Sequence, residues 1–306
     1  MVSLENPDLS IIILNYNVKE LLINCLESIV KNKRKEDNWQ IIVVDNGSED
    51  GSIREVREFR EKHPEVELVE NKENLGFSAG NNAGVKYVKA PVVLFLNPDT
   101  IIVDGAISKS LKFLESDPGI GALTCRVELP DGKLDYSCHR GFPTPWNSFC
   151  YFTGLAKLFP HSSLLSGYTA SFLDISKTHE IDCLTGAFLM VRKIAGDQAN
   201  WWDTDYFFNG EDIEFCYQLK EKGWQIWFYP QVKIIHYKGS SSGLKGTGIV
   251  KVDKDRKLEA VQHGVSAMRI FYKKHYYQVY PPIIRDLILA GIKLLEYSRR
   301  VKVWLS

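Results

Sequence analysis

The sequence predicts an α/β fold in which a mostly parallel central sheet is flanked by helices, followed by a C-terminal helical extension. Three observations support this prediction. Up to about residue 120, short continuous apolar runs alternate with segments of helical periodicity. Continuous apolar runs are typical of strands that are covered on both faces, and strand–helix alternation predicts right-handed crossovers and a parallel sheet. The end of the chain is amphipathic at helical spacing.

The expected elements follow from these periodicities. In the first half we expect strands at 10–14, 40–44, 67–70 and 92–96, and helices at 19–31, 53–62, 78–89 and 104–116. After residue 121 the pattern is less regular. We expect a turn at 130–133 between two short strands, and then a long loop at 141–177. Beyond it we expect strands at 186–192 and 225–228, helices at 212–222 and 256–274, and a glycine-rich loop at 239–248.

The composition is that of an ordinary globular protein. Among the 306 residues, 44% are hydrophobic and 25% are charged, which excludes a collagen-like, low-complexity or wholly disordered chain. The 38 basic residues balance the 38 acidic residues, which argues against a dedicated nucleic-acid binder. None of the 6 cysteines forms a C-x-x-C pair, and the sequence contains neither a signal-peptide pattern nor a membrane-spanning apolar run. We therefore expect a cytoplasmic protein.

Polar clusters directly follow three of the expected strands, at 15–17, 45–48 and 97–99. In parallel α/β sheets, ligands bind beyond the carboxyl ends of the strands, so these clusters should line one rim of the sheet. A carboxylate such as Asp99 at a strand end suits a divalent cation that is shared with substrate phosphates. Taken alone, however, Asn-Pro-Asp-Thr is also favourable turn chemistry.

Two further features of the second half have a structural as well as a functional interpretation. Glu211 and Asp212 open an amphipathic helix, where acidic residues are favoured for electrostatic reasons alone. His236 follows a strand and precedes the glycine-rich loop, and a single histidine is more often structural than a ligand. Only the combination of these features favours the functional interpretation.

Several segments, in their order and spacing, resemble family 2 glycosyltransferases of the GT-A fold over roughly residues 9–275. They are SIIILNYN (10–17), VVDNGSEDGS (43–52), ENLGFSAGNNAG (73–84), VLFLNPDT (93–100), DCLTGAFLMVRK (182–193), FFNGEDIEFCYQLKEKGW (207–224) and IIHYKGSSSG (234–243). The stretch LPDGKLDYSCHRGFPT (129–144) is similar to the rhamnosyltransferase branch, which transfers L-rhamnose from dTDP-L-rhamnose. Related hexosyl and fucosyl transferases share most of that pattern.

The resemblance implies a nucleotide-sugar site that is formed by Asn15, Tyr16, Asp45, Asn74, Gly76, Asn81, Asn97 and Asp99. Tyr16 should lie against the base, with Asn15 near it. Asp45 should accept a hydrogen bond from the imide N–H that uracil and thymine share. In the alternative, purely structural interpretation, Tyr16 is an aromatic residue that packs on the rim of the sheet, and Asn81 lies on the surface of a helix.

The resemblance also implies a divalent metal, Mg²⁺ or Mn²⁺. The motif at 97–99 stands where this fold usually has Asp-x-Asp, so Asn97 replaces the first acid and Asp99 becomes the main protein ligand. His236 matches the position that can complete the coordination, although it could instead shape the acceptor site. An imidazole ligand would favour Mn²⁺ somewhat over Mg²⁺.

Asp212 is the expected general base of an inverting transfer, with Glu211 as its neighbour. Adjacent helical residues point in different directions, so both cannot occupy one position. The resemblance further implies that Thr185, Gly186 and Ala187 shape the donor–acceptor pocket, and Arg140 is a weaker candidate for binding the acceptor. The expected organisation is a nucleotide-sugar-binding half (1–120) and an acceptor-binding, catalytic half (121–275) of one GT-A domain, followed by an amphipathic tail (276–306).

The tail leaves two interpretations open. Residues 283–297 are amphipathic, and Arg299, Arg300, Lys302 and Trp304 follow them. Such a helix can pack on the protein itself or on a second copy in a homodimer. It can also lie on a membrane surface, which would place the enzyme peripherally at the inner face of the cell membrane.

The function that these features predict is the transfer of L-rhamnose from dTDP-L-rhamnose to a glycan or a polyprenyl-diphosphate-linked acceptor. One alternative is transfer of another sugar from a UDP- or GDP-sugar. Another is a non-catalytic nucleotide-sugar-binding protein, which the joint presence of Asp99, Asp212 and His236 disfavours. A nucleotidyltransferase would share the metal chemistry, but the segments around 185–187 and 211–212 argue against it.

Overall fold

The computed structural model describes residues 6–238 and 254–305, and its centre is a nine-stranded mixed sheet. The strand order is β3-β2-β1-β4-β8-β6-β9-β5, and β7 pairs with β9 off this path. The strands are β1 (Leu9–Asn15), β2 (Trp39–Asp45), β3 (Val66–Glu70), β4 (Val92–Leu96), β5 (Thr100–Ile102), β6 (Ile120–Glu128), β7 (His179–Glu180), β8 (Phe188–Arg192) and β9 (Gln225–His236).

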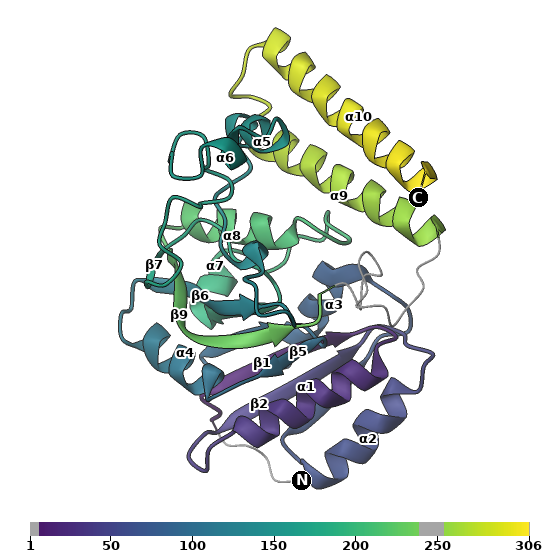
Figure 1. Cartoon of the computed structure of the whole chain (residues 1–306). Helices are drawn as coiled ribbons and strands as arrows, with labels where there is room; N and C mark the ends of the chain where they lie inside the picture. Colours follow the sequence, from purple (N-terminus) through teal and green to yellow (C-terminus); the bar gives the residue numbers. More distant parts are fainter. Residues whose placement is uncertain (1–5, 239–253, 306) are drawn as a thin grey trace.

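The helices cover the sheet and extend beyond it. They are α1 (Lys19–Asn32), α2 (Ser52–Lys62), α3 (Gly76–Val85), α4 (Ala106–Glu115), α5 (Pro145–Phe152), α6 (Leu155–Leu158), α7 (Lys193–Gln198), α8 (Glu211–Glu221), α9 (Lys254–His275) and α10 (Pro282–Leu305). Figure 1 shows α9 and α10 side by side beyond the sheet, as an antiparallel pair.

The first half of the sheet is parallel, as the sequence predicts. β1 pairs in parallel with β2 and β4, and β2 pairs in parallel with β3. All residues of β2 and β4 are buried, which explains their continuous apolar sequences. Asn15 and Asp45 are register partners, so the carboxyl ends of β1 and β2 meet at one edge of the sheet.

The second half makes the sheet mixed, which the periodicity alone does not predict. β8 is antiparallel to β4 and β6, and β5 is antiparallel to β9, whereas β6 and β9 are parallel. β9 continues from Gln225 to His236, so the strand expected at 225–228 and the strand expected directly before His236 form one strand. It can do so because the register between β6 and β9 shifts after Cys125, which accommodates the interruption around Pro230.

The segment 141–177 is not the uninterrupted loop that the sequence predicts, because it contains α5 and α6. Thr144 caps α5 by accepting a hydrogen bond from the amide of Asn147, and Pro145 starts the helix. This start signal is present in the sequence, but the weak periodicity after it favours a loop.

Three smaller predictions have different outcomes. After the turn at 130–133, the expected second strand is reduced to a single bridge between Glu128 and Leu134. The C-terminal helix is longer than the predicted 283–297, since α10 ends at Leu305. The expected glycine-rich loop at 239–248 lies outside the described residues.

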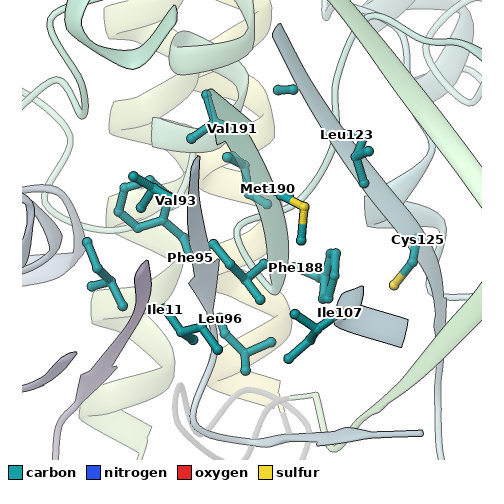
Figure 2. Close-up of a cluster of buried hydrophobic side chains, with 14 of the residues drawn as sticks. Ile11, Val93, Phe95, Leu96, Ile107, Leu123, Cys125, Phe188, Met190 and Val191 are labelled. Carbon is teal, nitrogen blue, oxygen red and sulfur yellow. The ribbon is translucent and has the colours of Figure 1, made fainter. Parts of the chain in front are cut away.

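The main hydrophobic core surrounds the central strands β4 and β8. Figure 2 shows Phe95, Met190 and other side chains from these strands gathered in one cluster. A separate, smaller cluster around Tyr272 and Ile292 holds α9 and α10 together, so the helical pair forms a layer of its own. In the described parts of the chain, we find no helix that is both long and apolar enough to span a bilayer.

The close approach of α3 to the sheet generates a test of the packing. A β-carbon at Gly84 would lie 2.8 Å from Cγ2 of Val44 and 3.0 Å from Cγ2 of Ile12. Both neighbours are buried and β-branched, so they cannot rotate away easily. We expect Gly84→Ala to lower the free energy of unfolding by about 1–3 kcal/mol, as measured by urea unfolding followed by circular dichroism.

The matched control is Gly291→Ala in α10, where no atom lies within 4 Å of the added β-carbon. This substitution should raise helix stability by about 0.5–1 kcal/mol, because alanine loses less backbone entropy than glycine in a helix. If both substitutions raised the free energy of unfolding by the same amount, α3 would not pack tightly on β1 and β2.

Candidate active site

A cleft of about 1450 Å³ opens at the carboxyl ends of β1 and β4, and it contains most of the predicted site residues. The structure brings together Tyr16, Asn74, Gly76, Asn97, Asp99, Arg140, Thr185, Gly186, Ala187, Glu211, Asp212 and His236 as lining residues. Residues from both halves of the chain and from α5, α9 and α10 form its walls. The predicted convergence at one rim of the sheet is therefore present.

Asn15, Asp45 and Asn81 are not among the residues that line the cleft. Asp45 is 1% exposed, and its carboxylate accepts hydrogen bonds of 2.8 Å from Nδ2 of Asn15 and from the amide of Ser48. Nδ2 of Asn81 donates to the carbonyl of Phe77 within α3. In the structure these three side chains stabilise the wall of the cleft, and their contact with a nucleotide stays a prediction.

Asn46 belongs to the cluster 45–48 that was expected at the rim, and it lines the cleft, but sequence reasoning gave it no role. Its Nδ2 donates to Oδ1 of Asn74 at 2.8 Å and to the carbonyl of Gly76, and its Oδ1 accepts from the amide of Leu75. Asn46 therefore fixes the loop between β3 and α3 at the edge of the cleft. The available signal was its place directly after a buried strand, beside Asp45.

Gly76 has a conformational reason to be glycine. Its φ is +80°, and a β-carbon there would lie 2.6 Å from the backbone oxygen of Phe207. The amide of Phe77 donates to that same oxygen at 2.8 Å. This contact ties the start of α3 to the segment before α8, so two walls of the cleft are joined.

Asp99 and His236 face each other in the cleft. β5 and β9 pair so that Thr100 lies opposite His236, which brings the histidine beside Asp99. Asp99 is 2% exposed, and Nε2 of His236 is 3.2 Å from its Oδ1, yet neither carboxylate oxygen has an aligned hydrogen-bond partner among the described residues. Two buried oxygens without hydrogen bonds are suited to binding a cation.

Asp135 is a residue that sequence reasoning missed. Its Oδ2 lies 3.2 Å from Nδ1 of His236, and its Oδ1 accepts from Nζ of Lys238 at 2.6 Å. Burial works against the charged form of the histidine, but the carboxylates of Asp135 and Asp99 raise the pKa of His236 to about 9. The surroundings thus favour a positive charge between Asp99 and His236, which a divalent metal can supply in place of a proton.

The donor set for such a metal is small. In residues 6–238 and 254–305, no group of three or more His, Cys, Asp or Glu side chains is arranged to hold a metal ion. The protein offers Asp99 and His236, and further oxygens would have to come from a phosphate ligand and water. This is typical of Mg²⁺ and Mn²⁺ sites that bind together with a substrate phosphate.

Asp212 is held by an ion pair at the start of α8. Nη2 of Arg140 donates to Oδ2 of Asp212 at 2.8 Å and also to the carbonyl of Leu184. The guanidinium is thereby committed to Asp212 and to the segment that precedes Thr185. The sequence predicts that Arg140 binds the acceptor. The contact that the structure shows is with Asp212, and it fixes the orientation of that carboxylate.

Glu211 differs from its neighbour in environment. It is buried, and its Oε2 has no hydrogen-bond partner in the part of the chain that the structure describes. Burial, and then the adjacent charge of Asp212, raise the pKa of the Glu211 carboxyl to about 8, so this group is protonated at neutral pH. The two adjacent acids thus occupy chemically distinct positions, which is consistent with only one of them acting as a base.

Comparison with known proteins finds glycosyltransferases that are similar to this chain. The N-acetylglucosaminyl-diphospho-decaprenol L-rhamnosyltransferase of Mycobacterium tuberculosis is 27% identical over 215 residues, which are 66% of this chain and 68% of the relative. The poly(ribitol-phosphate) beta-glucosyltransferase of Bacillus spizizenii is 27% identical over 227 residues, which are 68% of this chain and 34% of the relative.

Two solved structures share the fold. The mannosyltransferase PcManGT from Pyrobaculum calidifontis, in complex with GDP-Man and Mn²⁺, matches with a TM-score of 0.59 and 18% identity, over 98% of this chain and 74% of that chain. GalNAc-T7, with UDP, GalNAc and Mn²⁺, matches with a TM-score of 0.62 and 13% identity, over 94% of this chain and 55% of that chain. At these identities the likeness shows the GT-A fold alone.

The family model described as glycosyl transferase family 2 matches residues 10–176. This match covers more than half of the chain. It includes the carboxyl ends of β1, β2 and β4, which form the rim of the sheet at the cleft. The chain therefore belongs to glycosyl transferase family 2.

Proposed function

We propose that the protein is an inverting glycosyltransferase that moves L-rhamnose from dTDP-L-rhamnose onto a glycan or a polyprenyl-diphosphate-linked acceptor. The observation that supports it is one cleft that contains both Asp99 with His236 and the ion-paired Asp212. The rhamnosyl donor is favoured by the similarity to the mycobacterial rhamnosyltransferase. Transfer of a different sugar from a UDP- or GDP-sugar is the alternative.

In this proposal, the nucleotide lies against the rim of β1, β2 and β4. Tyr16 is 43% exposed at the cleft and offers its ring to the base. Each oxygen of Asp45 already accepts one hydrogen bond, but a carboxylate oxygen has a second lone pair for an imide N–H. Asn74, Gly76 and Asn97 line the path from the base towards the diphosphate.

Asp99 and His236 would hold Mg²⁺ or Mn²⁺, which supplies positive charge to the leaving nucleoside diphosphate when it is bound. Asp135 contacts the other ring nitrogen of His236, so it orients the imidazole towards Asp99. Lys238, which also lines the cleft, neutralises Asp135 through their ion pair.

The chemical step needs a base at the acceptor hydroxyl. In a direct displacement at the anomeric carbon, the Asp212 carboxylate accepts the proton of that hydroxyl. Arg140 fixes the orientation of Asp212, and the protonated Glu211 adds no second negative charge beside it. Thr185, Gly186 and Ala187 form the neighbouring wall, and Gly186 leaves room for the ring of Phe77.

The role of Asp212 is tested by Asp212→Asn. We expect transfer to fall by about 10²–10⁴-fold, because the amide cannot accept the proton, while the KM for the nucleotide sugar stays close to the wild-type value. The assay follows nucleoside diphosphate release from dTDP-L-rhamnose, UDP-glucose and GDP-mannose, with polyprenyl-diphosphate-linked N-acetylglucosamine as acceptor.

Glu221→Gln, at the exposed far end of α8, is the matched control and should leave the rate unchanged. Transfer at the wild-type rate by Asp212→Asn would refute the assigned base. A preference for GDP-mannose would refute the rhamnosyl donor and the contact proposed for Asp45.

The metal proposal is tested through Asp135. We expect Asp135→Asn to weaken Mn²⁺ binding by about 10–100-fold, since the imidazole of His236 loses its orienting carboxylate. Binding is measured by Mn²⁺ electron paramagnetic resonance in the presence of dTDP. Asp131→Asn, on the exposed turn four residues earlier, is the control. Equal Mn²⁺ affinity in all three proteins would contradict the metal site.

We further propose that α10 contacts an anionic membrane surface. One side of this helix leaves apolar side chains exposed, among them Ile283 at 75% and Leu294 at 69%. Lys293 and Lys302 are exposed on the same helix, so the surface offers cations beside its apolar side chains. This combination is typical of helices that lie in a lipid interface.

Vesicle co-sedimentation tests the membrane contact. Leu287→Asp with Leu294→Asp should lower binding to phosphatidylglycerol vesicles by at least about tenfold, because both side chains lose apolar burial. Ile194→Asp, at an exposed apolar position of α7, is the control. Absent vesicle binding, together with a dimer that the double variant dissociates, would instead assign this side of α10 to a second copy.

A further inference from the structure

One cation of the C-terminal helix faces the cleft rather than the exterior. Arg299 lines the cleft, and its guanidinium carbon is 5.8 Å from the ring centre of Phe152 in α5. Its neighbour Arg300 pairs with Glu296 at 2.8 Å, and Arg269 pairs with the same carboxylate group. Arg299 has no carboxylate partner within the described ranges, so its charge is available to a ligand.

The position of Arg299 relative to the catalytic acids follows from α9, which lies between them. Nη1 of Arg299 is 3.9 Å from the place of a β-carbon at Gly264, where the missing side chain leaves room for the guanidinium. Ala267, on the same side of α9, lies 2.8 Å from the place of a β-carbon at Gly210. Three helical residues span about 4.5 Å, so this helical turn together with the two contacts separates the guanidinium from the start of α8 by on the order of 10 Å.

The surroundings of Arg299 include aromatic side chains. Phe152 lies beside its guanidinium, and Tyr151, Met268 and Phe271 line the same cleft, together with the polar side chains of Glu259 and His263. From there α5 continues to the exposed rings of Trp146 and Phe149. A cation beside an aromatic wall that leads to an exposed apolar surface suits an anion that is attached to a hydrocarbon chain. A nucleotide sugar has no such chain.

The other cation that was expected to bind the acceptor is already occupied. Nη2 of Arg140 donates both to Asp212 and to the carbonyl of Leu184, so a phosphate bound by the rest of this guanidinium would compete with the ion pair that positions the base. Arg299 has no such commitment. A guanidinium can donate two parallel charge-assisted hydrogen bonds to a phosphate, and the partly buried position strengthens them.

We infer that Arg299 forms an anion-binding subsite at the acceptor end of the cleft, and that its ligand is the diphosphate of an acceptor with an apolar chain. This inference rests on the proposed glycosyltransferase function and adds a residue of the C-terminal helix to its binding site. Arg299 would hold the diphosphate while the sugar beyond it reaches Asp212.

The test uses the whole protein and three probes, which separate the effect of the phosphate charge from the effect of the hydrocarbon chain. They are farnesyl diphosphate, farnesol and inorganic pyrophosphate, and their binding is measured by calorimetry with Mn²⁺ and excess dTDP present to fill the donor end. Arg299→Gln should weaken farnesyl diphosphate binding at least about tenfold, and Arg299→Lys should weaken it less, because lysine keeps the charge but not the paired donors. Farnesol binding should not change.

Arg300→Gln is the matched control, since it removes the same charge from the next residue, which lies outside the cleft lining. The inference is overturned by an unchanged affinity in Arg299→Gln, by an equal loss in Arg300→Gln, by an equal loss for farnesol, or by a wild-type protein that does not bind farnesyl diphosphate. Pyrophosphate that binds as tightly as farnesyl diphosphate would overturn the assignment to a chain-bearing acceptor.

Failure of the proposed function has a different signature. Slow hydrolysis of the nucleotide sugar by water depends on the donor site alone, so it should be equal in wild type, Arg299→Gln and Arg300→Gln. A wild-type protein that neither binds nor hydrolyses any nucleotide sugar would refute the glycosyltransferase proposal. Normal hydrolysis with farnesyl diphosphate binding that does not depend on Arg299 would refute only the subsite.

Discussion

The antiparallel pairing of β8 with β4 determines where the active-site residues of the second half lie. Leu96, near the carboxyl end of β4, pairs with Phe188 at the amino end of β8. An antiparallel neighbour enters the sheet at the edge where the parallel strand leaves it. The segment 185–187 therefore lies at the same rim as 97–99, although nearly ninety positions separate them. The pairing of β5 with β9 has the same effect on His236 and Asp99.

This convergence concentrates acidic groups in one buried place, and each carboxyl group is stabilised in a different way. Asp45 accepts hydrogen bonds from Asn15 and Ser48, Asp212 has an arginine partner, and Glu211 keeps its proton. Among residues 6–238 and 254–305, the Asp99 carboxylate has no aligned hydrogen bond, and it lies beside the imidazole of His236. Because a buried charge is costly unless a charge of opposite sign compensates it, Asp99 needs a cation beside it, which is either the protonated imidazole of His236 or a metal ion.

The sequence predicts the parallel half of the fold, and most of the predicted site residues line the cleft, because apolar runs locate the strands and the polar residues after them share one rim. It does not predict Asp135 beside His236, since these residues are 101 positions apart and meet only through the mixed half of the sheet. The contact of Arg140 with Asp212, across 72 positions, has the same origin. Periodicity locates strands, but it does not determine their direction or their partners, so contacts that depend on antiparallel pairing stay hidden.

The C-terminal helix shows a further limit of pattern reasoning, because α10 has two apolar sides. Ile292 packs on α9, whereas Ile283, Leu287 and Leu294 are exposed. A helical wheel merges these sides and places Arg299 with the outer basic residues, but packing on α9 turns it towards the cleft. In the proposed arrangement, a helix that lies on a membrane by one side and borders the cleft by another would present Arg299 where the phosphates of a lipid-linked acceptor leave the bilayer surface. The same packing that fixes α10 on α9 would then set the distance between the membrane and Asp212.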